Sequence, residues 1–379
     1  MQGRGGCAID LDALAHNLGE VRRLVGPRVR ICAVVKANAY GHGAAPVSRR
    51  LLAGGAQMLA VASLDEAHEL RRGGIVAPIL VLGGVAPADA GAAVELGLSI
   101  VAWDGEALAT LASAVPAGRR LRVHLKVDTG LGRLGARPRD LAGLASAALA
   151  GPFEVEGVLS HLASGEVEDH PTVEEQQRAF EDAIAALAEG GLRPALRHLA
   201  NSGALLAHPS THYDMVRPGL VLYGALPAPA LAARIRVRPV MQLRATVLQV
   251  KDVEPGAGIG YGSTHRMARH GRIAVLHLGY AQGVPRALSN RGTAILRGHP
   301  APIVGMVSMD HTTVDATAIP EARAGDEAIL WGSDAPGNDV MSVGALAGTL
   351  GYELLTGVPR EVPRIHVSAD VARSATRQG

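Results

Sequence analysis

Short apolar runs alternate with longer stretches of helical periodicity from Arg30 to Arg217, and this alternation limits the fold more than any other feature. The runs are RICAVVK, MLAVAS, PILVLG, LSIVAW, RVHLKVD, VEGVLSH, LRHLANS and DMVR. The segments between them are amphipathic, and SLDEAHELRR begins with the Ser-x-x-Glu pattern typical of a helix N-terminus. Eight alternations of strand and helix predict an α/β chain with a TIM-like (β/α)8 barrel.

The chain changes character after a segment rich in Ala and Pro, residues 225–233. Beyond it, β-like runs are punctuated by Gly, Pro and Asp, with one helix expected near 342–351. The β-like runs are RATVLQV, RIAVLHL, TAILR, PIVGMVSM and EAILWG. Because 379 residues exceed what one hydrophobic core usually supports, we predict two domains: a barrel over residues 1–233 and a mostly-β domain over 234–379.

A helix is also expected before the first barrel strand. Apolar residues recur at helical spacing between Asp10 and Val25, namely Leu11, Leu14, Leu18 and Val21. This helix should pack on the outside of the barrel.

Bulk properties exclude several classes of function. A net charge of +2, without a stripe of Lys and Arg, argues against nucleic-acid binding and against an anionic membrane surface. Two cysteines cannot form a disulfide framework, no secretory signal precedes Asp10, and no run is long enough to span a membrane, so we expect a cytoplasmic protein. No His-Glu-x-x-His or paired-cysteine pattern occurs, so we predict no metal site.

Chemistry in such a barrel takes place at the carboxyl ends of its strands, where this sequence carries polar residues. Lys36 ends the first run and precedes a loop of small residues, ANAYGHG, through which a ligand could reach its amine. A partly desolvated lysine is a nucleophile. The alternative is a structural lysine whose stem packs at the strand end while its charge reaches water.

The segment VVKANAYGHG resembles the cofactor-attachment motif of alanine racemases. The resemblance continues in order through KVDTGLGRLG, the run from His198 to Ser202, DMVRPGLVLYG, GYGSTHR, SMDH and GYELLTGVPREVPR. It implies that Lys36 forms a Schiff base with pyridoxal 5'-phosphate and that Tyr40 helps to bind the phosphate. It also implies a barrel with a second, β-rich domain.

Barrel geometry gives separate support for a phosphate site, since barrels often build one from the loops after strands seven and eight. Those loops contain Ser202, which offers a hydroxyl, and Gly219 and Leu220, which offer backbone amides. Taken singly, each residue could equally be a helix cap or a turn glycine.

The resemblance places Arg217 against the pyridine nitrogen of the cofactor, with His161 and His198 as supporting hydrogen-bond partners. An arginine is always charged and disfavours protonation of that nitrogen, which should suppress transamination. Racemisation requires proton transfer on both faces of the α-carbon. Lys36 can serve one face, and Tyr261 resembles the family's base on the other.

Because Tyr261 lies in the second domain, the family's arrangement implies that a second subunit supplies it and that the enzyme is a homodimer. His265 and Arg266 are nearby candidates for lowering its pKa. The resemblance further assigns Arg133 to the substrate carboxylate, with Lys126, which can be carbamylated in the family, as its support. Met309 and Asp310 would close the pocket, Tyr280 would line its entrance, and Tyr352 would contact the phosphate and narrow the pocket.

We therefore predict that the chain interconverts L-alanine and D-alanine by a two-base mechanism. A serine or broad-specificity racemase is an alternative, because one added hydroxyl changes binding by only about 1 to 3 kcal/mol. An amino-acid decarboxylase of related architecture lacks a counterpart here for its C-terminal cysteine motif, since Cys7 and Cys32 lie near the start. A non-catalytic cofactor carrier would normally lack the second domain.

Overall fold

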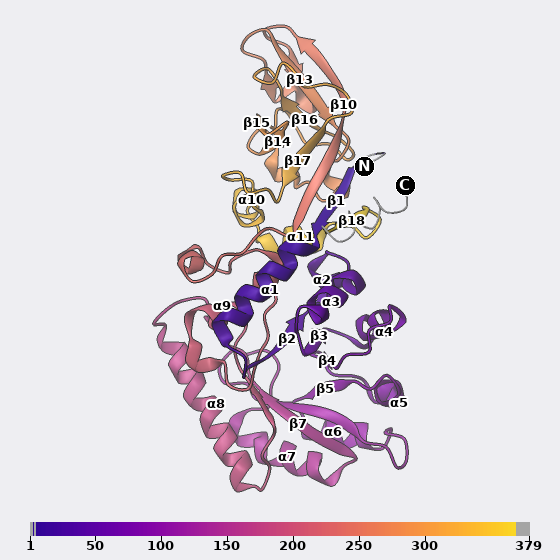
Figure 1. Cartoon of the computed structure of the whole chain (residues 1–379), viewed down its shortest axis with the longest axis vertical. Helices are drawn as coiled ribbons and strands as arrows, with labels where there is room; N and C mark the ends of the chain where they lie inside the picture. The colour runs from indigo at the N-terminus through magenta and orange to yellow at the C-terminus, as the bar shows by residue number, and fades with distance from the viewer. Residues whose placement is uncertain (1–2, 4, 369–379) are drawn as a thin grey trace.

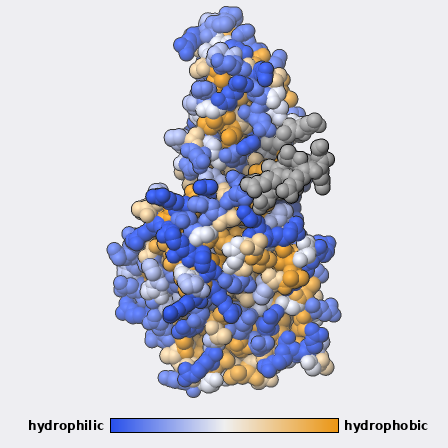
Figure 2. Space-filling view, viewed as in Figure 1, coloured by the Kyte–Doolittle hydropathy of each residue, from blue (hydrophilic) through white to orange (hydrophobic). Residues whose placement is uncertain are grey.

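The computed structural model describes residue 3 and residues 5–368. The molecule is elongated, with a barrel at one end and a β-rich domain at the other (Figure 1). In the same view, hydrophobic patches interrupt a mostly hydrophilic surface on both halves (Figure 2). Among the described residues, no helix is long and apolar enough to cross a membrane.

Eight parallel strands form the barrel, which confirms the eight predicted runs. They are β2 (Arg30–Val34), β3 (Met58–Val61), β4 (Ile79–Val81), β5 (Ser99–Ala102), β6 (Leu121–Lys126), β7 (Phe153–Leu159), β8 (Leu196–His198) and β9 (Met215–Val216). Their order is β8-β7-β6-β5-β4-β3-β2-β9. The seam between β8 and β9 is bridged by the Asp214 amide, which donates to the Arg197 carbonyl at 3.1 Å, and by the Asp214 carboxylate, which accepts from the Arg197 amide at 2.8 Å.

Helices cover this barrel as its sequence pattern predicts. They are α1 (Leu11–Val25), α3 (Ala44–Ala53), α4 (Leu64–Arg72), α5 (Ala90–Glu95), α6 (Gly105–Ala112), α7 (Leu141–Ala150), α8 (Pro171–Glu189) and α9 (Ser202–Ala207). The short segment α2 (Lys36–Tyr40) is a left-handed turn at the end of β2 rather than a covering helix. The predicted N-terminal helix is α1, whose Leu14, Leu18 and Val21 are buried. It begins where the Asp10 carboxylate accepts hydrogen bonds from the amides of residues 12 and 13.

The second domain is mostly β-structure, as predicted. Its strands are β1 (Gly5–Asp10), β10 (Met241–Val253), β11 (Gly258–Ile259), β12 (His265–Arg266), β13 (Gly271–Leu276), β14 (Thr293–Leu296), β15 (His299–Pro302), β16 (Thr312–Asp315), β17 (Glu327–Trp331) and β18 (Arg364–Val367), and its helices are α10 (Val340–Ala347) and α11 (Gly351–Gly357). The main sheet runs β15-β14-β17-β10-β1-β18, and β13 pairs with both β10 and β16.

Short 3₁₀ helices occur in both parts of the molecule. They are η1 (Pro87–Asp89), η2 (Pro138–Asp140), η3 (Pro209–Thr211), η4 (Leu220–Tyr223), η5 (Pro229–Ala233), η6 (Tyr261–Ser263), η7 (Tyr280–Gln282) and η8 (Arg286–Leu288).

The run PIVGMVSM is not the strand that its apolar residues suggest. Strand β15 ends at Pro302, and residues 304–311 follow an irregular path. Its backbone amides bond to side chains instead of to a neighbouring strand. The Asn290 side-chain oxygen accepts a hydrogen bond from the Gly305 amide at 2.6 Å, and the Ser289 hydroxyl accepts one from the Val307 amide at 2.9 Å. Gly305 also has a φ of 78°, outside the range of an extended strand.

The first strand of the chain belongs to the second sheet, although it lies within the range that we assigned to the barrel. Strand β1 pairs with β10 in antiparallel fashion and with β18 in parallel fashion. Both described ends of the chain therefore meet at the junction of the two halves (Figure 1). The domain ranges themselves stay a prediction.

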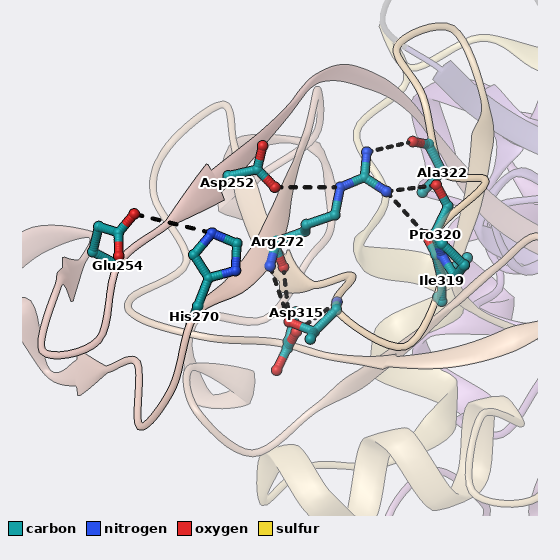
Figure 3. A network of polar contacts seen from close by, with 9 residues as sticks. Asp252, Glu254, His270, Arg272, Asp315, Ile319, Pro320 and Ala322 are labelled. Atoms are coloured by element: carbon teal, nitrogen blue, oxygen red, sulfur yellow. Dashed lines mark hydrogen bonds and ion pairs between the residues drawn. The ribbon is translucent and has the colours of Figure 1, made fainter.

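One arginine fastens a loop at the far end of the β-domain (Figure 3). Arg272 of β13 donates to the carbonyls of Pro320 and Ala322 at 2.6 and 3.2 Å and forms an ion pair with Asp252 at 3.8 Å. The loop after β16 is thereby tied to the β10–β13 hairpin.

Candidate active site

A cavity of about 550 Å³ opens at the carboxyl ends of the barrel strands, and α11 contributes to its wall. Ten of the predicted site residues line it: Lys36, Tyr40, Lys126, Arg133, His161, Ser202, Arg217, Gly219, Leu220 and Tyr352. Nine of them come from the ends of β2, β6, β7, β8 and β9 and from the segments that follow, and Tyr352 comes from α11. Residues spread over more than 300 positions of sequence thus meet at one place.

Lys36 stands at the start of a strained turn. Four successive non-glycine residues, 37 to 40, have φ values between 51° and 55°, which is the left-handed region. The small-residue loop expected after Lys36 is therefore a single left-handed turn. Each such residue costs about 1 to 2 kcal/mol relative to the right-handed form, so surrounding contacts must hold the turn.

Two distant elements hold this turn. On the barrel side, Glu66 of α4 accepts hydrogen bonds from the amides of Ala37 and Ala62, both at 2.7 Å. On the side of the β-domain, Arg364 of β18 donates to the carbonyl of Gly41 at 2.9 Å, and the His366 imidazole donates to the carbonyl of residue 42 at 2.8 Å. A helix of the barrel and a strand of the β-domain thus fix the backbone next to Lys36.

Burial lowers the pKa of Lys36 below its usual value, and the cation of Arg133 lowers it further, whereas the Glu66 carboxylate opposes both effects. We expect Glu66→Gln to lower the pKa of Lys36 further, because the anion that opposes the shift is lost. The glutamine also has only one acceptor atom for the two amides. The measurement is the pH dependence of Lys36 acylation in cofactor-free protein, followed by peptide mass spectrometry.

Asp65→Asn is the matched control for Glu66→Gln. Asp65 is the exposed neighbour in the first turn of α4, and its substitution removes the same charge. This control should leave the Lys36 titration unchanged. Equal titration curves for the native protein and Glu66→Gln would contradict the role given to Glu66.

A second group of cavity residues forms a cradle between Tyr40, Ser202 and Gly219. The Ser202 hydroxyl accepts from the amide of Gly219 at 2.9 Å, so that this amide is engaged within the protein rather than offered to an anion as we expected. A Cβ at Gly219 would lie 2.5 Å from the Tyr40 hydroxyl, so only glycine leaves room there. The ring of Tyr40 stacks on Tyr223, with centroids 4.8 Å apart.

Arg217 is buried, and hydrogen bonds orient its guanidinium. One terminal nitrogen donates to Nδ1 and to the carbonyl of His198 at 2.9 and 2.8 Å. The other donates to the carbonyls of Ser160 and Leu199, and it lies 3.3 Å from Nδ1 of His161. None of these bonds uses Nε, which leaves one N–H of this cavity-lining residue for a ligand.

Positive charge dominates the cavity. Burial and the cations of Arg217 and Arg133 lower the pKa of Lys126 to about 8, with Asp128 acting in the opposite direction. Burial and the same arginines lower the pKa of His161 to about 3, so its imidazole is neutral. The cavity therefore suits an anionic ligand such as a phosphate ester or a carboxylate.

The loop that carries Arg133 is shaped by Asp128. Its carboxylate accepts hydrogen bonds from the amides of residues 130, 131 and 132 at 3.0, 2.9 and 3.2 Å. This local turn starts where β6 ends and directs Arg133 to the cavity wall.

Apart from Tyr352, the predicted site residues of the β-domain do not line this cavity. Tyr261, Tyr280 and Met309 are 76%, 44% and 55% exposed, which is unusual for large apolar side chains. His265 pairs within the short β11–β12 ribbon, and Asp310 accepts from the Gln282 amide at 2.9 Å. Within one chain, these five residues are not assembled with Lys36.

Sequence reasoning missed two acidic residues near the site, Glu66 and Glu156. Glu66 belongs to the Ser-x-x-Glu pattern in the sequence, but we interpreted this pattern only as the start of a helix. The Ser63 hydroxyl does accept from the Glu66 amide at 3.4 Å, while the Glu66 carboxylate turns to Ala37 and Ala62. Glu156 lies in a barrel strand with no motif around it. Within the described part of the chain, no group of three or more His, Cys, Asp or Glu residues is placed to hold a metal ion.

Two family models match the chain. The N-terminal domain of alanine racemase matches residues 9–227, and the C-terminal domain of alanine racemase matches residues 240–366. Among curated relatives, the alanine racemase of Symbiobacterium thermophilum is 43% identical over 365 residues, covering 94% of this chain and 96% of that protein. That of Desulfovibrio desulfuricans is 41% identical over 363 residues, covering 95% and 97%.

Solved structures agree with this match. The alanine racemase of a D-cycloserine-producing Streptomyces lavendulae superposes with a TM-score of 0.91 at 37% identity, covering 97% of this chain and 98% of that one. The Bacillus anthracis alanine racemase, solved with bound L-Ala-P, has a TM-score of 0.90 at 32% identity, covering 97% and 96%. Sequence, fold and cavity thus agree, and the chain belongs to the alanine racemase family.

Proposed function

We propose that this chain interconverts L-alanine and D-alanine with pyridoxal 5'-phosphate as its cofactor, and that it works as a homodimer. The observation that carries the proposal is the meeting of Lys36, Ser202 and Arg217 in one cavity at the strand ends. The relatives named above are called alanine racemases, and their similarity extends over nearly the whole chain.

The cavity residues fit this cofactor. The half-buried amine of Lys36 would bind its carbonyl carbon, Tyr40 and Ser202 would hold its phosphate, and the free Nε–H of Arg217 would face its ring nitrogen. The absence of a side chain at Gly219 makes room for the Tyr40 hydroxyl beside Ser202. When bound, pyridoxal phosphate withdraws electrons from the substrate α-carbon and makes its proton acidic.

Arg217 determines which reaction follows. Burial lowers its pKa to about 10, so the guanidinium is still a cation at neutral pH. A permanent donor at the ring nitrogen leaves that nitrogen without a proton. Reprotonation is then directed to the α-carbon, which favours racemisation over transamination.

Two groups exchange the α-proton. Lys36, with its lowered pKa, takes or returns the proton on one face as a neutral amine. Tyr261 of the partner subunit acts on the opposite face, with His265 beside it in sequence. In support, Tyr261 is exposed and lies outside the cavity of its own chain, so a second copy is needed to complete the site.

The remaining residues hold the substrate. Arg133, with Lys126 as its support, binds the carboxylate in the positively charged part of the cavity. Tyr352 of α11 narrows the space beside Tyr40, with ring centroids 6.3 Å apart, which favours a methyl side chain. Tyr280, Met309 and Asp310 close the entrance when the dimer forms.

The test measures the absorption spectrum of the protein, the attachment of the reduced cofactor to Lys36 and the interconversion of the two alanine enantiomers. Purified protein should absorb in the visible range, lose that band with borohydride and retain the reduced cofactor on Lys36, as read by peptide mass spectrometry. L-alanine and D-alanine should interconvert until equal amounts are present. A stable preference for serine over alanine would contradict the substrate, and carbon dioxide release from diamino acids would contradict the reaction.

We further propose that the protein acts in the cytoplasm. Both cysteines, Cys7 and Cys32, are free and buried, so neither contributes a disulfide. Burial raises the pKa of both thiols, to about 11 and about 12, so they remain protonated and unreactive. Such thiols are compatible with a reducing compartment.

A further inference from the structure

A chain of polar side chains crosses the barrel and ends at Arg217. Nδ1 of His198 lies 2.9 Å from the guanidinium, and Nε2 of His198 lies 2.8 Å from Nδ1 of His124. Nε2 of His124 then lies 3.0 Å from the carboxylate of Glu156, and the same carboxylate oxygen accepts from the Ser99 hydroxyl at 2.6 Å. Strands β5 to β8 each contribute one member, and Arg217 directly follows β9.

The chemistry of the two ends fixes every proton in this chain. A guanidinium can only donate, so Nδ1 of His198 must accept. An imidazole that accepted at both nitrogens would have no proton, so Nε2 of His198 carries one and donates it to His124. His124 therefore accepts at Nδ1 and donates from Nε2, and a carboxylate, which only accepts, is the partner that this donor requires.

A defect in the sheet places Glu156 where it can complete the chain. In the pairing of β6 with β7, Val123 is opposite Val155 and His124 is opposite Gly157, which leaves Glu156 as an extra residue in a β-bulge. Bulges re-aim side chains. A Cβ at Gly157 would lie 2.4 Å from Nδ1 of His124, so the glycine makes the space for the ring.

We infer that Glu156 and His124 are positioning residues for Arg217: acting through His198, they fix the direction of its hydrogen bonds. The inference rests on the proposed function, in which Arg217 faces the ring nitrogen of the cofactor. Hydrogen bonds from His124 and Ser99 lower the pKa of Glu156 to about 2, so the carboxylate is ionised. The Glu156 side chain is 20% exposed, so one end of the chain reaches solvent while the other ends at the cavity.

The first test uses cofactor-free protein and does not depend on activity. Nitrogen NMR of histidine-labelled protein distinguishes protonated from unprotonated ring nitrogens, and His124→Gln and His198→Gln assign the two rings. We expect both rings to carry their proton on Nε2. A proton on Nδ1 of either ring, or on both nitrogens of His124, would overturn the inference.

Variants at Glu156 separate its hydrogen bond from its charge. Glu156→Gln keeps an acceptor oxygen, so the His124 Nε2–H signal should persist. Glu156→Ala removes the acceptor, so that proton should exchange with solvent much faster. Glu154→Ala is the control, because Glu154 is exposed on the same strand two residues away. An unchanged His124 signal in Glu156→Ala would count against the inference.

The second test uses the loaded enzyme. We expect Glu156→Ala to lower kcat about tenfold, with little change in KM for alanine, because Arg133 is untouched. The amount of pyruvate formed by transamination, relative to the amount of alanine racemised, should rise. The reason is that Arg217, when less firmly held, no longer keeps the ring nitrogen unprotonated. Glu154→Ala should change neither. If the native protein does not racemise alanine, the proposed function fails, while the NMR result still decides the inference.

Discussion

Lys36→Ala should abolish alanine racemisation to within the detection limit, a loss of roughly 10⁴-fold or more, because the substitution removes both the cofactor anchor and one of the two bases. The visible absorption band should shift, since the cofactor can no longer form its bond to the protein. The measurement is racemisation by circular dichroism, together with the spectrum of the reconstituted variant.

Folding of this variant is checked by its elution volume and its thermal unfolding, which should resemble those of the native protein. Added methylamine should restore a small part of the proton transfer, because it supplies an amine of similar size. Activity within tenfold of native would contradict the assignment of Lys36.

Tyr261→Phe is expected to lower kcat by about 10²- to 10⁴-fold, because it removes one proton-transfer group and leaves the cofactor site intact. The loss should be unequal for the two enantiomers. In deuterated water, exchange of the α-proton should survive for the enantiomer whose proton faces Lys36 and fail for the other. Tyr213→Phe is the control, since the Tyr213 hydroxyl donates to Glu181 at 2.9 Å and this residue does not line the cavity.

Mixed dimers provide a sharper test of where Tyr261 acts. A dimer that combines a Lys36→Ala chain with a Tyr261→Phe chain has one site with both defects and one site with neither, provided that each site takes its tyrosine from the other chain. Such a mixture should regain activity that neither variant has alone. No recovery in verified mixed dimers would show that Tyr261 serves its own chain, or that it does not serve at all.

The barrel was predictable because its signal is local. Each apolar run forms one strand, and each amphipathic segment forms the helix that covers it, so counting eight runs is enough to indicate the fold. The polar residues that end these runs were predictable as cavity residues for the same reason. Lys36 and Arg217 follow their strands directly, and the carboxyl ends of parallel strands lie at one end of a barrel.

The left-handed turn after Lys36 could not be predicted, because Ala37 to Tyr40 include no glycine. The contacts that hold it come from residues distant in sequence: Glu66 is 29 positions from Ala37, and Arg364 is 323 positions from Gly41. A local pattern carries no information about such partners.

The same limit applies to Glu156. In the sequence it is one more charged residue in the alternating run EVEG, which suggests a solvated side chain. Its contact with His124 depends on a single-residue bulge in the pairing of β6 and β7, and strand register is not encoded within one strand.

The arrangement of β1 has a consequence for biosynthesis. This strand leaves the ribosome before its parallel neighbour β18, which is made more than 350 residues later. At about 5 to 20 residues per second, roughly 20 to 70 s separate the two events. The nascent barrel can close in that interval while the backbone hydrogen-bonding groups of residues 5–10 are still unpaired. A stalled or shortened chain would therefore expose an unpaired strand that can pair with another chain, whereas the complete sheet buries this strand.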